Sequence, residues 1–221
     1  MNSSKKFTKI VQKCCYSKTW EIKENDKLLI LAPHPDDESI GCGGLLLKYG
    51  KQVDIMVLTD GRYGNPEWSE EDTVKIRKKE FELAMKFIGI NSYAFIEAED
   101  SNLHKNFEKF KQIKKKLNNY DYIIIPNPSD MHPDHMIVKY MLDKIIPLRF
   151  KGKIVYYEIW SALSSPTHYI DISDIVNDKK DLINTYKSQI KHIDYASRIL
   201  SLNNYRGILH NIKHEEAYQI I

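Results

Sequence analysis

The stretch LLILAPHPDDESIGCGG, residues 28–44, decides the fold of this chain. Its first five residues are apolar and lead into a turn rich in proline and acidic side chains, as buried strands often do. Gly41, Gly43 and Gly44 follow, and such small residues suit the close packing of a helix against a sheet. The stretch therefore predicts a strand, a polar turn and a helix in succession.

The same alternation continues along the chain. Further short apolar runs predict strands at residues 53–58, 92–96, 122–125 and 154–160. Apolar residues at helical spacing predict helices at residues 44–49, 73–88, 107–117 and 135–146. Apolar strands that alternate with helices predict an α/β fold, a Rossmann-like, mostly parallel sheet with helices on both faces.

Length and composition predict one folded domain. The chain has 221 residues, of which 42% are hydrophobic and 29% charged, as in ordinary soluble proteins. We expect a single domain over residues 1–221, with an N-terminal extension at 1–25 and a mostly helical C-terminal part at 173–221. An odd number of cysteines, three, fits a reducing compartment better than a disulfide framework.

The net charge and the hydropathy of the chain limit the classes of partner that it is expected to bind. The net charge of +3 is spread along the chain, so composition gives no support for nucleic-acid binding. No window approaches the roughly 18 consecutive apolar residues of a membrane span. No apolar core follows Lys5 and Lys6, as a signal peptide would require. We expect a cytoplasmic protein without a membrane span, and the sequence is compatible with a homo-oligomer.

Polar clusters follow three of the predicted strands, at residues 33–38, 59–62 and 126–135. In open parallel sheets, ligands bind outside the carboxyl ends of the strands, where the strand order reverses. We therefore expect these turns to share one site. The glycines after the first turn come too late for a GxGxxG dinucleotide fingerprint, and the sequence contains neither a P-loop nor a GxSxG elbow.

Two histidine motifs in these turns indicate a metal site. His34 stands three residues before Asp37, an offset that brings both side chains to one side of a helix entry. His132 and His135 repeat the offset. Three nitrogen or oxygen ligands and an open position are typical of catalytic zinc, so these four residues are candidate ligands. Each HPD triplet is alternatively a capping turn, but two of them at two strand ends favour a metal.

Two further carboxylates have predicted catalytic roles. Asp36 competes with Asp37 for the metal, and one of the two serves better as a base. Asp36 would then accept a proton from the attacking water. Asp134 lies between two histidines and would orient His132 by binding one ring nitrogen, so that the other nitrogen faces the substrate.

Polar residues at the same strand ends are candidates for substrate binding. Asp60 and Arg62 follow the second strand and are candidates for substrate binding. Arg62 would bind phosphate or sugar hydroxyl groups, with a surface salt bridge as the alternative. Asp100 and Asn127 follow the third and fourth strands and would face the same opening, with a turn role as the alternative. Three aromatic residues near these turns would stack on a sugar or pack in the core: Tyr63, Trp68 and Trp160, for which the core is the default.

Together these motifs resemble those of the PIG-L / LmbE-like family of zinc-dependent N-deacetylases. The motifs are PHPDDE at 33–38, LTDG at 58–61 and HPDH at 132–135. Further matches are Arg77, Glu80, Ala84, Gly89, Lys179, YKSQ at 186–189 and EAY at 216–218. The resemblance covers roughly residues 26–220, and the two HPD motifs in this order make it specific.

The resemblance implies a role for each motif residue. One Zn²⁺ per chain, or another divalent metal, would be bound by His34, Asp37 and His135. Asp36 would be the general base, and His132, oriented by Asp134, would stabilise the oxyanion or protonate the leaving amine. Some branches of the family carry Tyr or Arg where this chain has Asp130 and Met131, so an oxyanion donor used there is absent or comes from elsewhere.

The implied activity is that of an N-deacetylase. Its substrate would be an N-acetylglucosamine-type sugar conjugate, and its products acetate and an amino sugar, in glycan, glycolipid or natural-product biosynthesis. One alternative is a noncatalytic sugar- or nucleotide-binding α/β module with HPD turns as caps. Another is a metal-dependent phosphoester hydrolase, although many such enzymes use two metals and the sequence shows one well-formed cluster.

Overall fold

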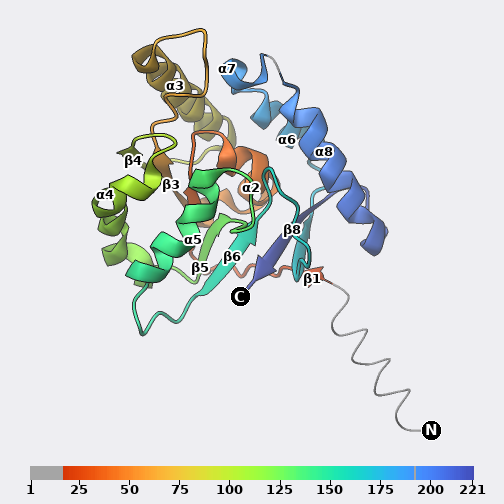
Figure 1. Ribbon diagram of the computed structural model, residues 1–221. Coiled ribbons are helices and arrows are strands. Elements are labelled where there is room, and N and C mark those ends of the chain that lie inside the picture. Colours follow the sequence, from red (N-terminus) through yellow and green to blue (C-terminus); the bar gives the residue numbers. More distant parts are fainter. Residues whose placement is uncertain (1–16, 192) are drawn as a thin grey trace, which may run out of the picture.

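The computed structural model describes residues 17–191 and 193–221, so most of the expected extension at 1–25 lies outside the described residues. Within this part, the strands form one sheet in the order β1-β7-β8-β6-β5-β2-β3-β4 (Figure 1). The strands are β1 (Lys18–Thr19), β2 (Leu28–Ala32), β3 (Val53–Thr59), β4 (Tyr93–Ala98), β5 (Tyr122–Pro126), β6 (Lys153–Tyr157), β7 (His168–Asp171) and β8 (Glu215–Ile220).

Helices connect most of these strands. The α-helices are α2 (Asp37–Tyr49), α3 (Glu70–Ile88), α4 (Phe107–Lys111), α5 (Pro133–Ile145), α6 (Val176–Ile183), α7 (Lys187–Ile190) and α8 (Tyr195–Arg206). Short 3₁₀ helices are η1 (Gly50–Gln52), η2 (Leu103–Asn106), η3 (Gln112–Asn119) and η4 (Gly207–His210). The helix predicted at 107–117 is thus a short α-helix that continues as a 3₁₀ helix.

The strand order reverses between β2 and β5. From β2 the sheet runs through β3 to β4 on one side, and from β5 to β6 on the other, all in parallel. The reversal places the turns after β2 and β5 side by side, where such sheets bind ligands. Beyond β6, strand β8 runs antiparallel between β6 and β7. The predicted mostly parallel α/β sheet is confirmed.

The sheet separates two hydrophobic cores. Leu28 and Ile30 of β2 face one core, and Leu29 and Leu31 face the other. Helices α2, α3, α6 and α8 cover the first face, whereas α4 and α5 cover the second (Figure 1). Because both faces are covered, every residue of β2 is buried, which explains its uninterrupted apolar sequence.

Helix α2 begins earlier than the sequence predicts, at Asp37 and not at residue 44. Its glycines weaken the helical pattern, but they allow close approach to neighbouring side chains. A Cβ atom on Gly41 would lie 2.2 Å from Tyr157 Cδ2, and one on Gly44 would lie 2.3 Å from Ile172 Cγ2. This close packing holds α2 against Tyr157 of β6 and against Ile172, which follows β7.

The C-terminal part contains a strand as well as helices. After α8, strand β8 carries Glu216, which is buried beside α2. Just beyond a kink at Cys42, the backbone N–H groups of Gly44 and Leu45 donate to the Glu216 carboxylate at 2.6 and 2.9 Å. Lys179 Nζ binds the same carboxylate at 2.7 Å, so β8 and α6 together hold α2. Among the described helices, none has the length and apolar character of a membrane span.

Candidate active site

The turn between β2 and α2 brings two candidate ligands together. His34 follows β2, and Asp37 is the first residue of α2. The Oδ2 atom of Asp37 accepts the backbone N–H of His34 at 2.8 Å and lies 3.1 Å from His34 Nδ1. One buried carboxylate oxygen therefore fixes both the backbone and the ring of His34.

His135 completes a triangle of ligand atoms. It lies in the first turn of α5, which follows β5, the neighbour of β2. Its Nε2 is 3.1 Å from Asp37 Oδ2 and 3.3 Å from His34 Nδ1. Two ligand atoms that bind one zinc ion at about 2.0–2.1 Å in tetrahedral geometry lie about 3.4 Å from each other. Two imidazole nitrogens and a carboxylate oxygen at the observed distances therefore fit one ion.

Asp130, to which the sequence assigned no role, positions His135. Its Oδ1 lies 3.0 Å from His135 Nδ1 and accepts the backbone N–H of His132 at 3.0 Å. Its Oδ2 accepts the backbone N–H groups of Trp160 and Ser161 at 2.9 and 3.0 Å. Such a carboxylate fixes the ring orientation and leaves Nε2 available for a metal. The sequence feature that could have indicated this role is the position of Asp130 in the turn after β5, beside the second histidine motif.

The other ring nitrogen of His34 faces two carboxylates. Its Nε2 lies 3.1 Å from Asp100 Oδ1 and 3.4 Å from Asp134 Oδ2, so these three residues form a second group with cation-binding atoms. Asp134 also accepts the backbone N–H groups of Ser101 at 2.7 Å and Leu103 at 3.2 Å. With these oxygen atoms engaged, the two carboxylates are better suited to orient the His34 ring than to bind a second ion.

His132 is the N-cap residue of α5 and lines the cavity over the cluster. The predicted contact of Asp134 with one ring nitrogen of His132 is made by the backbone N–H of Asp134, which donates to His132 Nδ1 at 3.2 Å, and not by the Asp134 carboxylate. The carboxylate is engaged by other backbone groups. With Nδ1 as the acceptor, Nε2 of the neutral ring carries the proton. Burial, and then the nearby His34 and His135, lowers the pKa of His132 and favours this neutral form.

Asp36 lies beside the ligands in a backbone conformation that favours glycine, with a φ of 148°. Arg77 holds this turn. Its Nη2 lies 3.1 Å from Asp36 Oδ1 and donates to the Pro35 carbonyl at 3.1 Å, while Nη1 donates to the Gly61 carbonyl at 3.1 Å. Burial raises the pKa of Asp36 to about 6, against the opposing effect of Arg77. At neutral pH the carboxylate is therefore ionised.

The ligand residues are surrounded by an excess of negative charge. Burial raises the pKa of Asp37, but His135 and His34 outweigh it and hold that pKa far below the usual value. Burial lowers the pKa of His135, but Asp37 and Asp130 outweigh it and raise the pKa to about 9. Burial also lowers the pKa of His34, and the carboxylates around it raise the pKa well above the usual value. A cation at this position would balance these carboxylates.

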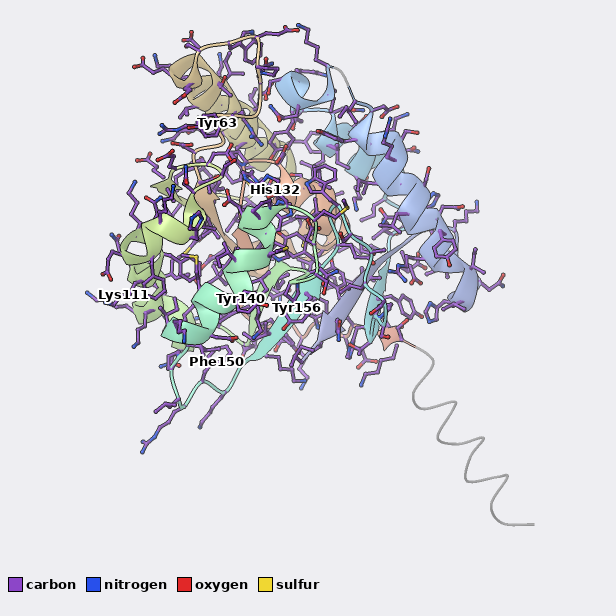
Figure 2. All side chains as sticks on the ribbon, in the orientation of Figure 1. Tyr63, Lys111, His132, Tyr140, Phe150 and Tyr156 are labelled. Atoms are coloured by element: carbon purple, nitrogen blue, oxygen red, sulfur yellow. The ribbon has the colours of Figure 1, made fainter. Side chains whose placement is uncertain are left out.

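A cavity of about 270 Å³ opens over the cluster. Figure 2 shows His132 at the start of α5 and Tyr63 on the turn above it, and both residues line the cavity. Trp160 lines it too and is 38% exposed, so the default expectation of core packing is wrong. Gln189 and Tyr195 reach the cavity from the C-terminal part. Sequence reasoning assigned a site role to neither, although the YKSQ match at 186–189 includes Gln189. Tyr195 carried no such signal, because helical periodicity does not indicate which side chains reach a distant site.

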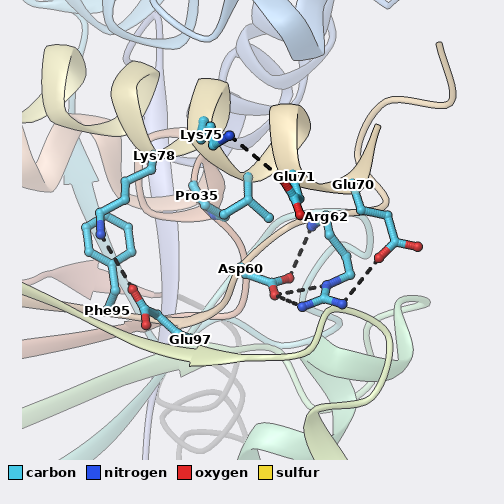
Figure 3. Close-up of a pocket in the computed structure, with 10 residues that line it drawn as sticks. Pro35, Asp60, Arg62, Glu70, Glu71, Lys75, Lys78, Phe95 and Glu97 are labelled. Atoms are coloured by element: carbon cyan, nitrogen blue, oxygen red, sulfur yellow. Dashed lines mark hydrogen bonds and ion pairs between the residues drawn. The ribbon is translucent and has the colours of Figure 1, made fainter. Parts of the chain in front are cut away.

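Asp60 and Arg62 lie outside this cavity. They line a separate cavity of about 600 Å³ beside α3, shown in Figure 3. Arg62 Nη2 and Nε donate to Asp60 Oδ2 at 2.6 and 3.0 Å, and Nη1 lies 3.2 Å from Glu70 Oε2. The guanidinium group is thus used in salt bridges, which was the alternative to substrate binding.

Asn127 also lies apart from the cluster. It lines a further cavity of about 290 Å³, and its Oδ1 accepts the backbone N–H of Ser129 at 3.0 Å, which is a turn role. Of the polar candidates Asp60, Arg62, Asp100 and Asn127, the structure brings only Asp100 to the cavity over the cluster, where it joins the aromatic candidates Tyr63 and Trp160.

Comparisons with known proteins point to the same region. The family model PIG-L, described as GlcNAc-PI de-N-acetylase, matches residues 29–146, which include the three candidate ligands. The diacetylchitobiose deacetylase of Thermococcus kodakarensis is 23% identical over 211 residues, covering 85% of this chain and 79% of that protein.

Solved structures share the fold. The N,N'-diacetylchitobiose deacetylase of Pyrococcus horikoshii aligns with a TM-score of 0.77 and 22% identity, over 99% of this chain and 92% of that chain. The 4-carboxy-2-hydroxymuconate hydratase GalB of Pseudomonas putida KT2440 aligns with a TM-score of 0.70 and 15% identity, over 89% of this chain and 96% of that chain. The PIG-L model spans more than half of the sequence and both histidine turns, so this chain belongs to the PIG-L family.

Proposed function

We propose that this protein is a zinc-dependent N-deacetylase that hydrolyses the acetamide of an N-acetylglucosamine-type sugar conjugate. One observation carries the proposal: three ligand atoms, His34 Nδ1, Asp37 Oδ2 and His135 Nε2, lie 3.1–3.3 Å apart beside Asp36 and His132. The family match and the deacetylase relative support the same reaction. Glycan, glycolipid or natural-product biosynthesis is the context that we propose.

His34, Asp37 and His135 would hold the metal. When bound, zinc polarises the amide carbonyl and lowers the pKa of water. Two imidazoles and one carboxylate are a donor set that zinc accepts in catalytic sites, and three protein ligands leave an open position. Asp100 and Asp130 would keep the two rings in the binding orientation.

Asp36 is the proposed general base. It lines the cavity and is ionised at neutral pH, because its pKa is about 6. It would take a proton from the attacking water while the new C–O bond forms at the acetamide carbon. It would return that proton to the nitrogen as the C–N bond breaks. The acyl product is acetic acid, which at neutral pH gives its proton to the amine or to water, so acetate and the amino sugar leave and Asp36 is again ionised.

His132 is the proposed donor to the oxyanion. Its Nδ1 accepts the backbone N–H of Asp134, so the proton on Nε2 is available to the substrate oxygen. A donor that is already oriented stabilises the charge that develops in the transition state. Because a lowered pKa keeps His132 neutral, the proton for the leaving amine comes from Asp36.

Acetate release tests the proposal. Zinc-loaded protein is assayed with free N-acetylglucosamine and with its UDP-, lipid- and inositol-linked forms, with Asp36→Asn as the matched control. We expect acetate from at least one conjugate. Asp36→Asn should retain zinc in metal analysis and lose about 100-fold or more in kcat, which is the usual cost of removing a general base. His135→Ala should instead lose zinc.

Other outcomes identify the alternatives. No acetate from any conjugate, with zinc shown to be bound, would contradict the deacetylase. Phosphate release from a sugar phosphate would favour a phosphoester hydrolase. Hydration of 4-carboxy-2-hydroxymuconate, the substrate named for GalB, would favour a hydratase on this fold. Sugar binding that is unchanged by chelation would favour the noncatalytic module.

A further inference from the structure

We propose that the deacetylase site extends into an apolar groove that binds an alkyl or aryl aglycone of the sugar conjugate, an inference that rests on the proposed function. The groove has a volume of about 480 Å³ and lies between the turn after β6 and helix α8. Its apolar lining residues are Ile159, Trp160, Ile193, Tyr195, Ile199 and Leu202.

The groove adjoins the catalytic cavity. Trp160 and Tyr195 line both spaces, and their ring centroids are 5.1 Å apart. The backbone N–H of Trp160 donates to Asp130, whose other oxygen contacts the candidate ligand His135. The shared wall is thus fixed relative to the ligand cluster. A sugar in the cavity would therefore meet the groove at a defined position.

The side chains of the groove offer an apolar surface. Ile159 and Ile199 are buried, with exposed fractions of 3% and 7%, whereas Ile193 and Trp160 expose 39% and 38%. Apolar side chains exposed around a concave surface are typical of a binding site. Arg198 also lines the groove, and an arginine can keep its charged group in water while its stem packs against an apolar ligand.

The catalytic cavity is small for a whole sugar conjugate. Its volume of about 270 Å³ is below the range of about 300–1,000 Å³ that is usual for small-molecule sites. The cavity at Asp60 and Arg62 shares no lining residue with the catalytic cavity, and the ion pairs of Arg62 with Asp60 and Glu70 lie along it. The groove beside Trp160 is the extension whose chemistry fits an alkyl or aryl group.

Binding of two glycosides tests the proposal. Methyl and octyl N-acetyl-β-glucosaminide, the latter below its micelle concentration, are titrated into the Asp36→Asn variant, which should bind without turnover. Transfer of the longer chain from water into the groove should tighten binding by about tenfold or more. Ile193→Asp should bring the two affinities together. Leu209→Asp, at a residue that is 63% exposed and outside the groove, should preserve the octyl preference.

The ratio of kcat/KM for the same two glycosides, measured on the unaltered enzyme, does not depend on how the variants fold. A ratio of about ten or more in favour of octyl supports the groove. Equal affinities and equal kcat/KM values would overturn it, as would an octyl preference that survives Ile193→Asp. The unaltered protein could instead form a dimer that Ile193→Asp abolishes and show no preference for the octyl glycoside. That result would assign the groove to a second copy of the chain and also overturn the proposal.

Acetate release separates this proposal from the deacetylase itself. Acetate from the methyl glycoside without an octyl preference contradicts the groove alone. Octyl-selective binding that Ile193→Asp removes, without acetate from either glycoside, contradicts the deacetylase and supports the groove.

Discussion

Asp36 combines a proposed catalytic role with a strained backbone. A φ of 148° costs a non-glycine residue about 1–3 kcal/mol. The contacts of Arg77 with the Asp36 side chain and with the carbonyl groups of Pro35 and Gly61 stabilise the turn against this strain. The strained conformation brings the carboxylate to the cavity beside the ligands.

Glycine and alanine at position 36 separate strain from charge. Both Asp36→Gly and Asp36→Ala remove the carboxylate and its contact with Arg77. Glycine adopts this conformation without penalty, so Asp36→Gly should have a free energy of unfolding about 1 kcal/mol higher than that of Asp36→Ala. Urea denaturation of the two variants measures the difference. Equal stability would show that the turn relaxes when the side chain is shortened.

The convergence of the candidate ligands could be predicted from the sequence, whereas the contact of Asp130 with His135 could not. His34, Asp37 and His135 meet because strand ends converge where the strand order reverses, and both the strands and the turns are readable. Asp130 binds His135 through a geometry set by the start of α5. Arg62 was expected to face substrate, but a carboxylate two residues away binds its guanidinium. No spacing rule decides such local competition.

At the scale of elements, the position of helix α2 depends more on close packing at Gly41 than on close packing at Gly43. A Cβ on Gly41 would lie 2.2 Å from a Tyr157 ring carbon and 2.7 Å from the Glu158 carbonyl oxygen, which belongs to the backbone. A Cβ on Gly43 would lie 3.1 Å from Lys179 Cγ, a side-chain contact that a shift of a few tenths of an ångström relieves. The first contact forces the helix or the strand to shift, and the second does not.

Alanine at these two glycines should therefore have different effects. Gly41→Ala should lower the free energy of unfolding by about 1–3 kcal/mol, as overpacking in a core does. Gly43→Ala should be close to neutral, because alanine favours a helix over glycine by about 1 kcal/mol and offsets the tight contact. Chemical denaturation midpoints compare the two. A more stable Gly41→Ala would mean that α2 does not require this approach.

Strand β8 was not predicted, for a physical reason. Glu215 and Glu216 open it, and charged residues interrupt the apolar run that marks a buried strand. Glu216 is compatible with burial because Lys179 and two backbone N–H groups of α2 bind its carboxylate. These partners are far away in the sequence. Propensity within a short window therefore misses a strand that long-range contacts stabilise.

For the whole molecule, a metal ion should act as a link between two segments. His34 and Asp37 follow β2, and His135 follows β5. A ligand that binds only the folded state adds about 2.7 kcal/mol to its stability when present at a hundredfold excess over Kd. Zinc should therefore raise the unfolding temperature, and a chelator should reverse the change. In His135→Ala the zinc-induced shift should disappear.

The zinc-induced shift should grow as the pH rises from about 6 to about 9. Zinc needs neutral imidazoles, whereas the pKa of His135 is raised to about 9 and that of His34 is also raised. In the metal-free protein, the protonated rings of His135 and His34 stabilise the folded state fully below about pH 6.5, the usual pKa of histidine. This stabilisation is lost as the pH rises through the raised pKa values that the two rings have in the folded protein. Thermal unfolding with and without zinc at several pH values measures both trends. A shift that is equal at all of them would contradict this linkage.

The separation of His34 and His135 along the chain has a consequence for the order of folding. The two residues are 101 positions apart, and the strands that bring them together, β2 and β5, pair in parallel. Contacts of such long range form late, because the entropy of a large loop must be lost before they contribute. A folding intermediate with formed helices but an incomplete sheet would lack the ligand triangle. The nascent chain would thus be unable to bind the proposed metal ion at this site before β2 and β5 have paired.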